Sequence, residues 1–259
     1  MLLIVRWAVL LIEMIRYFFE ISYNGTSFYG WQKQVGQISV QELVETCLKK
    51  VFQKEKIEIV GCGRTDKGVH ARNYIFHCDF KGEISPDTTV YKLNKMLPNS
   101  ISVSSIFPVN TDIHARFSAS SRTYRYFIHQ QKDPFLSEFS TFIPQKLEIE
   151  MMNDSCRYLL GEQDFSSFAK IHTDVKTHIC VVYDAKWFHM ENQLVFEISA
   201  DRFLRNMVRA IVGTMLDIGM KKLMPENLPK IIEQKNRSAA SKSVSANGLF
   251  LWKVNYPFL

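Results

Sequence analysis

Apolar residues recur along this chain with two different spacings, and these spacings divide it into predicted helices and strands. Residues 39–54 form the clearest helix, because apolar side chains return every three or four positions on one face. Ser39 and Glu42 form a capping box, which satisfies free backbone amides at the start of that helix. Residues 16–23 are rich in aromatic and β-branched side chains and end at an Asn-Gly pair, which predicts a strand followed by a turn.

The predicted elements follow similar orders in the two halves of the chain. After the first strand and helix come predicted strands at 58–60 and 74–80, a helix that starts at Ser85 and ends before Pro98, and a strand at 101–107. This order of strand, helix, strand, strand, helix, strand resembles a ferredoxin-like unit. The second half shows a similar pattern with one additional helix: a strand at 123–129, a helix at 148–160, a hairpin of 181–189 and 194–199, helices at 202–218 and 225–234, and a strand at 249–254.

We therefore predict an α+β protein made of two ferredoxin-like halves with mainly antiparallel sheets. The N-terminal α+β domain is expected to comprise residues 14–115 and the C-terminal α+β domain residues 116–259. Residues 1–13 are apolar apart from Arg6 and Glu13, but a bilayer span needs about 20 residues. They also lack the basic start and the small-residue cleavage site of a signal peptide. We interpret them as an extension or a misplaced start codon, and we expect a cytoplasmic protein without membrane association.

Composition adds a modest indication of the partner. The chain has 259 residues, of which 46% are hydrophobic and 22% charged, as in ordinary globular proteins. Lys and Arg number 32 against 26 acidic residues, and the resulting net charge of +6 favours a polyanionic partner without identifying it. The five cysteines form no CxxC pair, which is typical of free thiols in a reducing compartment. His77-Cys78 has no second pair with ligand spacing, so we expect no zinc site.

The glycine-rich run at residues 61–68 is the most unusual stretch of the chain. It begins like a dinucleotide-binding fingerprint, but the third glycine falls two positions late, and the P-loop pattern is absent. One interpretation is a polar turn with a surface pair between Arg64 and Asp66. The other is a presented Asp66 carboxylate, since glycines on both sides permit a close approach of substrate and a nearby arginine keeps the acid ionised.

A family resemblance decides between these interpretations. The run Gly-Arg-Thr-Asp-Lys-Gly-Val-His-Ala at residues 63–71 resembles the signature of the tRNA pseudouridine synthase A family. Further runs that resemble the family follow its order along the chain, and they lie at residues 23–32, 114–126, 161–165, 203–209 and 248–251. The resemblance extends over about residues 14–259.

The resemblance implies a fold, an activity and a partner. The two α+β halves would join behind a basic central cleft, and two copies of the chain would form a homodimer that binds tRNA. The activity would be the isomerisation of uridines at positions 38, 39 and/or 40 of the anticodon stem-loop to pseudouridine. Breaking the uracil–ribose bond, turning the base and rejoining C5 to C1′ conserves all atoms and exchanges no electrons. The reaction therefore requires neither a redox cofactor nor ATP, and we expect no cofactor.

The resemblance also assigns roles to residues. Asp66 would be the catalytic carboxylate, acting either as a nucleophile or as a base at the sugar. Tyr124 would stack on the target base, Arg209 would pair with the aspartate, and Leu249 would line the pocket. The residues expected to contact RNA are Arg64, His114, Ala115, Arg116 and Phe117.

Several alternatives stay open at this point. Tyr124 lies in an alternating strand, where sheet packing is the default role. Arg202, Arg205 and Arg209 have helical spacing and could form a solvated face, although the apolar remainder of that segment favours a cleft-facing Arg209. A non-catalytic RNA-binding or chaperone protein would carry the same basic cleft. A phosphotransferase with an aspartate nucleophile is disfavoured, because no acidic cluster for Mg²⁺ follows Asp66.

Overall fold

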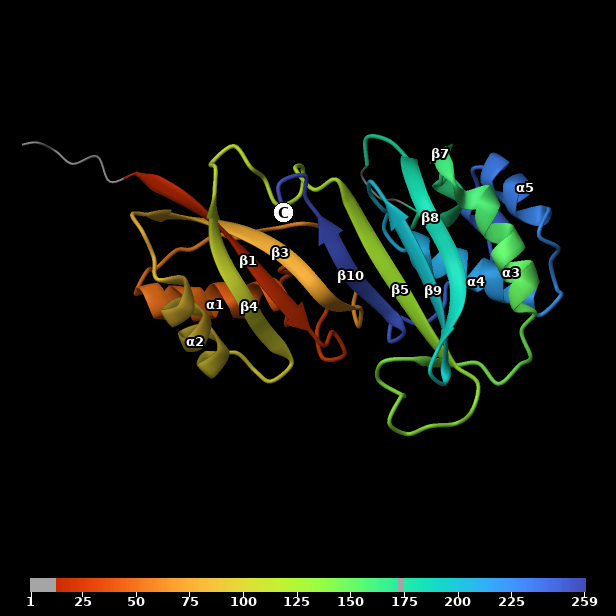
Figure 1. The fold of residues 1–259 in the computed structure, drawn as a ribbon, viewed down its shortest axis with the longest axis horizontal. Helices are drawn as coiled ribbons and strands as arrows, with labels where there is room; N and C mark the ends of the chain where they lie inside the picture. Colours follow the sequence, from red (N-terminus) through yellow and green to blue (C-terminus); the bar gives the residue numbers. More distant parts are fainter. Residues whose placement is uncertain (1–12, 172–174) are drawn as a thin grey trace, which may run out of the picture.

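One sheet runs through the part of the chain that the structure describes (Figure 1). The computed structural model describes residues 13–171 and 175–259, so the predicted extension lies outside the described residues except for Glu13. The ten strands of the sheet are β1 (Met14–Tyr23), β2 (Val60–Gly61), β3 (His70–Lys81), β4 (Ile101–Val109), β5 (Ser121–His129), β6 (Thr141–Phe142), β7 (Gly161–Asp164), β8 (Ile179–Met190), β9 (Gln193–Ala200) and β10 (Leu249–Asn255). Their main order is β4-β1-β3-β10-β5-β9-β8-β7, with β2 beside β3 and β6 beside β5.

The same strand order occurs in both halves of this sheet. In the first half β4, β1, β3 and β2 lie side by side, and in the second half β10, β5, β9 and β8 do. Counted along each half, with β6 and β7 left out of the second, this is the order fourth, first, third, second, and all pairs within these two sets are antiparallel. The predicted α+β fold with mainly antiparallel pairing is confirmed.

The two halves join through β3 and β10, which run parallel to each other. Phe250 pairs with His70 and Leu251 with Ala71, while β2 pairs with β3 further along the strand. Because β10 is the last strand of the chain, the second half closes against the strand that follows the glycine-rich loop. The topology therefore brings that loop to the junction of the two halves.

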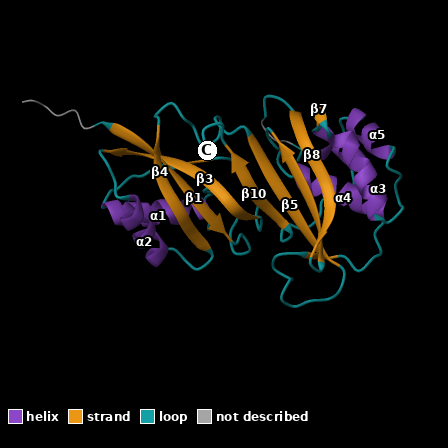
Figure 2. Cartoon of the chain, viewed as in Figure 1, coloured by secondary structure: helices purple, strands orange, loops and turns teal. Residues whose placement is uncertain are grey.

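The helices lie in two groups towards the two ends of the sheet (Figure 2). They are α1 (Val40–Phe52), α2 (Pro86–Met96), α3 (Ile149–Cys156), α4 (Met207–Gly219) and α5 (Asn227–Glu233), with short 3-10 turns at Arg157–Leu159, Ser166–Phe168 and Arg237–Ala239. One apolar core packs around α1 and the strands of the first half, and a larger one around α3, α4 and α5. The boundary at residues 115 and 116 stays a prediction.

The helix predicted at 202–218 starts later than expected. Residues 202–206 form a loop, and Asn206 has a φ of 69°, in the left-handed region that a helix interior does not use. The side chain of Asp201 accepts a hydrogen bond from the backbone amide of Arg202 at 2.7 Å, which supports the loop conformation. Arg202 and Arg205 therefore do not lie on a helix face, and their helical spacing was misleading.

Other differences are smaller. The helix predicted at 148–160 ends as α3 at Cys156 and continues as a 3-10 turn, and the strand predicted at 58–60 is reduced to β2. Neither β6 nor β7 was predicted, since each is short and pairs with a longer neighbouring strand. Such strands depend on their partner for backbone hydrogen bonds and leave a weak local signal.

Candidate functional site

The glycine-rich loop between β2 and β3 is anchored on the segment that follows β1. Gly30 has a φ of 84°, and a side chain there would place its Cβ 2.2 Å from the carbonyl oxygen of Thr65. The amide of Trp31 donates to the same carbonyl at 3.3 Å, and the amide of Gly68 donates to Phe28 at 3.2 Å. Phe28 and Trp31 are each only 3% exposed, so they belong to the core and offer no stacking surface for RNA. This contact fixes the loop that carries Asp66.

The carboxylate of Asp66 reaches across the junction to two arginines of the second half. Its Oδ1 lies 3.3 Å from Nε of Arg205, and its Oδ2 lies 3.8 Å from a terminal nitrogen of Arg209. Arg209 is 22% exposed and its Nε also donates to the carbonyl of Val244 at 2.8 Å, whereas Arg205 is 55% exposed. The expected contact between Arg209 and Asp66 is thus present, and Arg205 adds a second one that sequence reasoning missed.

Tyr124 lies on β5 between the two apolar cores and packs against both. Its ring meets Phe203 edge to face at a centroid distance of 5.0 Å. Burial raises the pKa of Tyr124, and the charges of Cys62 and Asp66 raise it further while Arg122 lowers it. The phenol is therefore neutral at physiological pH, as a ring that stacks on a base would be.

Leu249 and Arg64 occupy contrasting environments. Leu249 begins β10, pairs with Tyr126 and is 6% exposed within the larger core. Arg64 is exposed, two residues before Asp66 in the same loop. Their roles as pocket lining and RNA contact stay predictions.

The segment at residues 114–117 divides into an inner and an outer pair. The ring Nδ1 of His114 accepts hydrogen bonds from the amides of Arg116 at 3.0 Å and Phe117 at 3.3 Å. Burial lowers the pKa of His114, as do the charges of Arg16 and Arg116, so the ring is a neutral acceptor. Ala115 is fully buried, while Arg116 and Phe117 are exposed, Phe117 by 76%. Arg116 and Phe117 are therefore the most accessible residues of this segment, His114 is half-buried, and Ala115 is not accessible to a large ligand.

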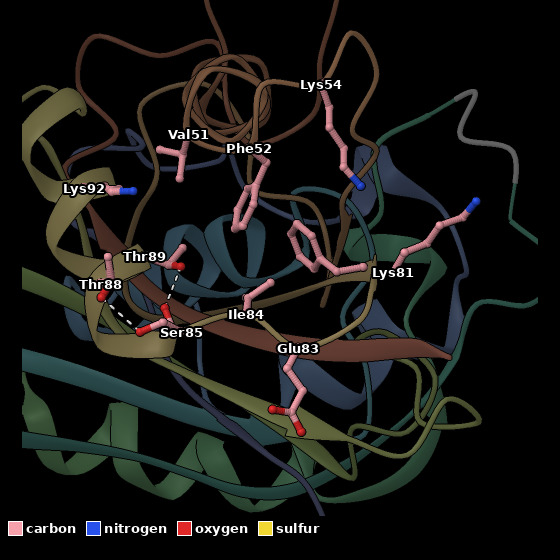
Figure 3. A pocket seen from close by; sticks show the side chains of 11 residues that line it. Val51, Phe52, Lys54, Lys81, Glu83, Ile84, Ser85, Thr88, Thr89 and Lys92 are labelled. Carbon is pink, nitrogen blue, oxygen red and sulfur yellow. Dashed lines mark hydrogen bonds between the residues drawn. The ribbon is translucent and has the colours of Figure 1, made fainter. Parts of the chain in front are cut away.

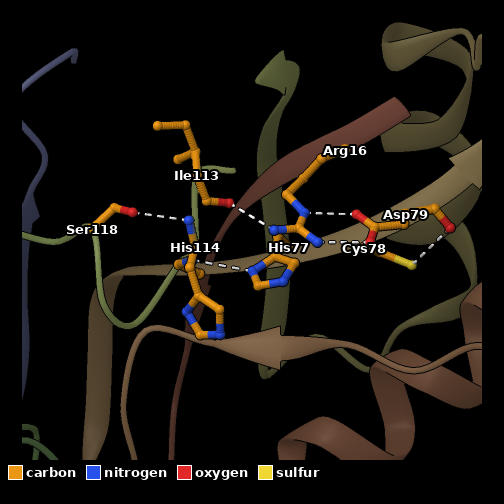
Figure 4. Close-up of polar contacts among 8 residues, drawn as sticks. Arg16, His77, Cys78, Asp79, Ile113, His114 and Ser118 are labelled. Atoms are coloured by element: carbon orange, nitrogen blue, oxygen red, sulfur yellow. Dashed lines mark hydrogen bonds and ion pairs between the residues drawn. The ribbon is translucent and has the colours of Figure 1, made fainter. Parts of the chain in front are cut away.

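Two side chains of the first half fasten this segment to the sheet (Figure 4). Nδ1 of His77 accepts from the amide of Ala115 at 3.1 Å, and burial lowers the pKa of His77 to about 4, helped by the charges of Arg16 and His114. Arg16 forms a bidentate pair with Asp79 at 2.7 Å and also donates to the carbonyl of Ile113 at 2.9 Å. The outer residues of the segment therefore project from a rigid base.

A separate cavity of about 340 Å³ lies between the end of α1, the end of β3 and the start of α2 (Figure 3). Lys54, Lys81 and Lys92 line it together with Phe52 and Phe80, and none of the predicted site residues does. Within residues 13–171 and 175–259 no three His, Cys, Asp or Glu side chains gather as a metal site would require. No helix in the same ranges is long and apolar enough to cross a membrane.

Comparison with known proteins supplies the family. The sequence pattern of the family described as tRNA pseudouridine synthase matches residues 21–118 and 155–257. The chain belongs to this family.

Relatives in the family match nearly the whole chain. The protein named tRNA pseudouridine synthase A from Bacteroides fragilis is 46% identical over 93% of this chain and 96% of its own length. The protein of the same name from Bacillus licheniformis is 41% identical over 91% of this chain and 97% of its own length. A solved structure titled "Crystal Structure of a Cbf5-Nop10-Gar1 Complex" has low structural similarity to this chain. The TM-score is 0.32 and the sequence identity 12%, over 77% of this chain and 54% of that one.

One further residue of this tRNA pseudouridine synthase family member escaped sequence reasoning. Arg122 on β5 donates to the carbonyls of Ala119 at 3.1 Å, Asp201 at 2.8 Å and Cys62 at 3.1 Å, and also to that of Arg116. It stands directly before the conspicuous Thr-Tyr-Arg-Tyr run, but two of its partners, Cys62 and Asp201, lie 60 and 79 positions away in the sequence. No spacing rule could have found them.

Proposed function

We propose that this protein converts uridines at positions 38, 39 and/or 40 of tRNA anticodon stem-loops to pseudouridine, with Asp66 as its essential carboxylate. Membership in the tRNA pseudouridine synthase family and relatives named tRNA pseudouridine synthase A support an isomerase that acts on tRNA. The observation that carries the role of Asp66 is its place at the junction of the halves, beside two arginines of the second half.

The isomerisation of uridine needs a carboxylate, a surface for the displaced base and a cation beside the carboxylate, and Asp66, Tyr124 and Arg209 can provide them. The N1–C1′ bond of uridine breaks, the base turns, C5 bonds to C1′, the proton leaves C5 and N1 gains one. Asp66 serves at the sugar as nucleophile or as base. Since the target base must leave the stack, the neutral ring of Tyr124 gives it a surface, and Arg209 orients the carboxylate.

The substrate and the assembly belong to the same proposal. The net charge of +6 and the exposed arginines Arg64, Arg116 and Arg205 suit a polyanion such as tRNA. We place the protein in the cytoplasm, in keeping with its five free and buried cysteines. A homodimer that binds one tRNA in a basic cleft completes the proposal.

The test is tritium release from tRNA that carries 5-³H-uridine, measured in EDTA with the wild type and with Asp66→Asn. Release by the wild type alone, with the modified sites in the anticodon stem-loop, supports both the reaction and its carboxylate. A folded wild-type protein that binds tRNA without release contradicts the proposal and leaves a non-catalytic RNA-binding protein. Equal release by Asp66→Asn contradicts the role of Asp66 alone.

A further inference from the structure

Arg122 draws three distant chain segments together at one point beside the catalytic loop. Its guanidinium donates to backbone carbonyls of Cys62 in that loop, of Arg116 in the β4–β5 connection, and of Asp201 after β9. An arginine carries several donors in one rigid plane, so a single side chain can serve all three segments. The backbone positions of these segments are thereby fixed relative to one another.

Each of the three segments carries an arginine next to this point. Arg64 lies two residues after Cys62, Arg116 itself supplies one of the carbonyls, and Arg202 directly follows Asp201. Burial and then the charges of Arg64, Arg202 and Arg122 lower the pKa of Arg116, in keeping with a close gathering of these side chains. We call Arg64, Arg116 and Arg202 the arginine triad.

The arginine triad has no acidic counterpart in the part of the chain that the structure describes. None of its guanidiniums forms an ion pair or a side-chain hydrogen bond there. Asp201 is the neighbouring acid, but its Oδ1 accepts from the backbone amides of Val181 and Arg202, each at 2.7 Å. Like charges held together cost free energy unless an anion joins them, because guanidiniums repel one another in a partly desolvated site.

We propose that the arginine triad is one binding site for the RNA sugar–phosphate backbone next to the target uridine. The new member is Arg202, which brings the second half of the chain into this contact. Guanidiniums bind phosphate oxygens in bidentate fashion, which suits the sugar–phosphate backbone. The assignment of RNA as the ligand rests on the proposed function.

The test measures binding of an isolated anticodon stem-loop by proteins that also carry Asp66→Asn, so that no turnover intervenes. The dissociation constant is determined from about 50 to about 200 mM salt for this parent, for Arg202→Gln and for Arg157→Gln. Arg157 is a matched control, since it is an exposed arginine in the 3-10 turn after α3. Arg202 is half-buried and Arg157 is exposed, and each substitution removes one positive charge.

The expected result follows from counterion release. Loss of one phosphate contact reduces the slope of log affinity against log salt by about 0.7–0.9, so the loss of affinity over this salt range becomes about threefold smaller. We expect this change for Arg202→Gln and an unchanged slope for Arg157→Gln. An unchanged slope for Arg202→Gln, or the same change in both variants, overturns the proposal.

The tritium-release assay separates this outcome from a failure of the proposed function. If the wild type releases tritium and Arg202→Gln keeps the parent slope, the arginine triad is not a phosphate site while the isomerase stands. If the wild type releases none but the slope falls only for Arg202→Gln, RNA binding at the triad stands without the isomerase.

Discussion

Replacing Arg122 by lysine tests how the site is held together. The substitution keeps the positive charge but offers a single ammonium in place of a planar fork. Arg122 donates four hydrogen bonds to backbone carbonyls, and a lysine, which has three N–H donors on one nitrogen, would leave at least one of these carbonyls without its donor. A hydrogen bond to a charged group contributes about 1.5–3 kcal/mol, so the free energy of unfolding should fall by about 1.5–3 kcal/mol.

Activity should fall as well, because one of these bonds fixes Cys62 in the loop that carries Asp66. A misplacement of about 1 Å at a reacting group costs on the order of 100-fold in rate. Urea unfolding measures the first effect, and kcat/KM for tritium release, taken where the variant is folded, measures the second.

Arg125→Lys is the matched control on the same strand. Arg125 pairs with Glu197 at 2.6 Å and lies over the ring of Trp252 at 4.2 Å, and it does not contact the loop that carries Asp66. A lysine can keep the ion pair, so a cost of about 1 kcal/mol and an unchanged kcat/KM are expected. If Arg122→Lys is as stable and active as the wild type, or if the control loses as much, the positioning role of Arg122 is refuted.

Three further predictions concern single positions. Gly30→Ala should lower the free energy of unfolding by more than about 2 kcal/mol, because its Cβ would overlap a backbone carbonyl at 2.2 Å. Gly36→Ala is the control, since Gly36 is also at positive φ but has no atom within 4 Å of the added Cβ, and it should cost about 1 kcal/mol. Equal costs of the two substitutions in urea unfolding would show that backbone strain alone matters. His77 has a folded-state pKa of about 4, below its ordinary 6.5, so the unfolded chain binds the extra proton between these values and stability is lost as the pH falls from 6.5 to about 4. The same pH series on His77→Asn should lose this part of the slope, and an identical slope would contradict the assignment. Arg209→Gln should lower kcat by about 100-fold, and Arg205→Gln, at the more exposed arginine, by less than about fivefold. A larger loss of kcat in Arg205→Gln than in Arg209→Gln would count against the orienting role of Arg209.

Elements with a strong local pattern were predicted well. Helix α1 lies at Val40–Phe52 within the predicted range, and Ser39 caps it by accepting from the amide of Glu42. Both its apolar face and its cap come from residues within a few positions of one another, so the local sequence contains the information. The start of α4 was mispredicted because Leu204 continues the apolar spacing of the helix. Leu204 lies in the preceding loop, and its side chain is buried there.

By itself, the sequence determined the similar order of strands and helices in the two halves and the contiguous run that carries Asp66. Both features depend only on residues that are close together in the sequence. Only the tertiary structure decided which side chains meet at the site. Arg205 contacts Asp66 across 139 positions of the chain, and Arg122 contacts Cys62 across 60. Hydrogen bonds and ion pairs form only between groups a few ångströms apart, whatever their separation along the chain. Here the parallel pairing of β10 with β3 brings the two halves of the chain within that distance.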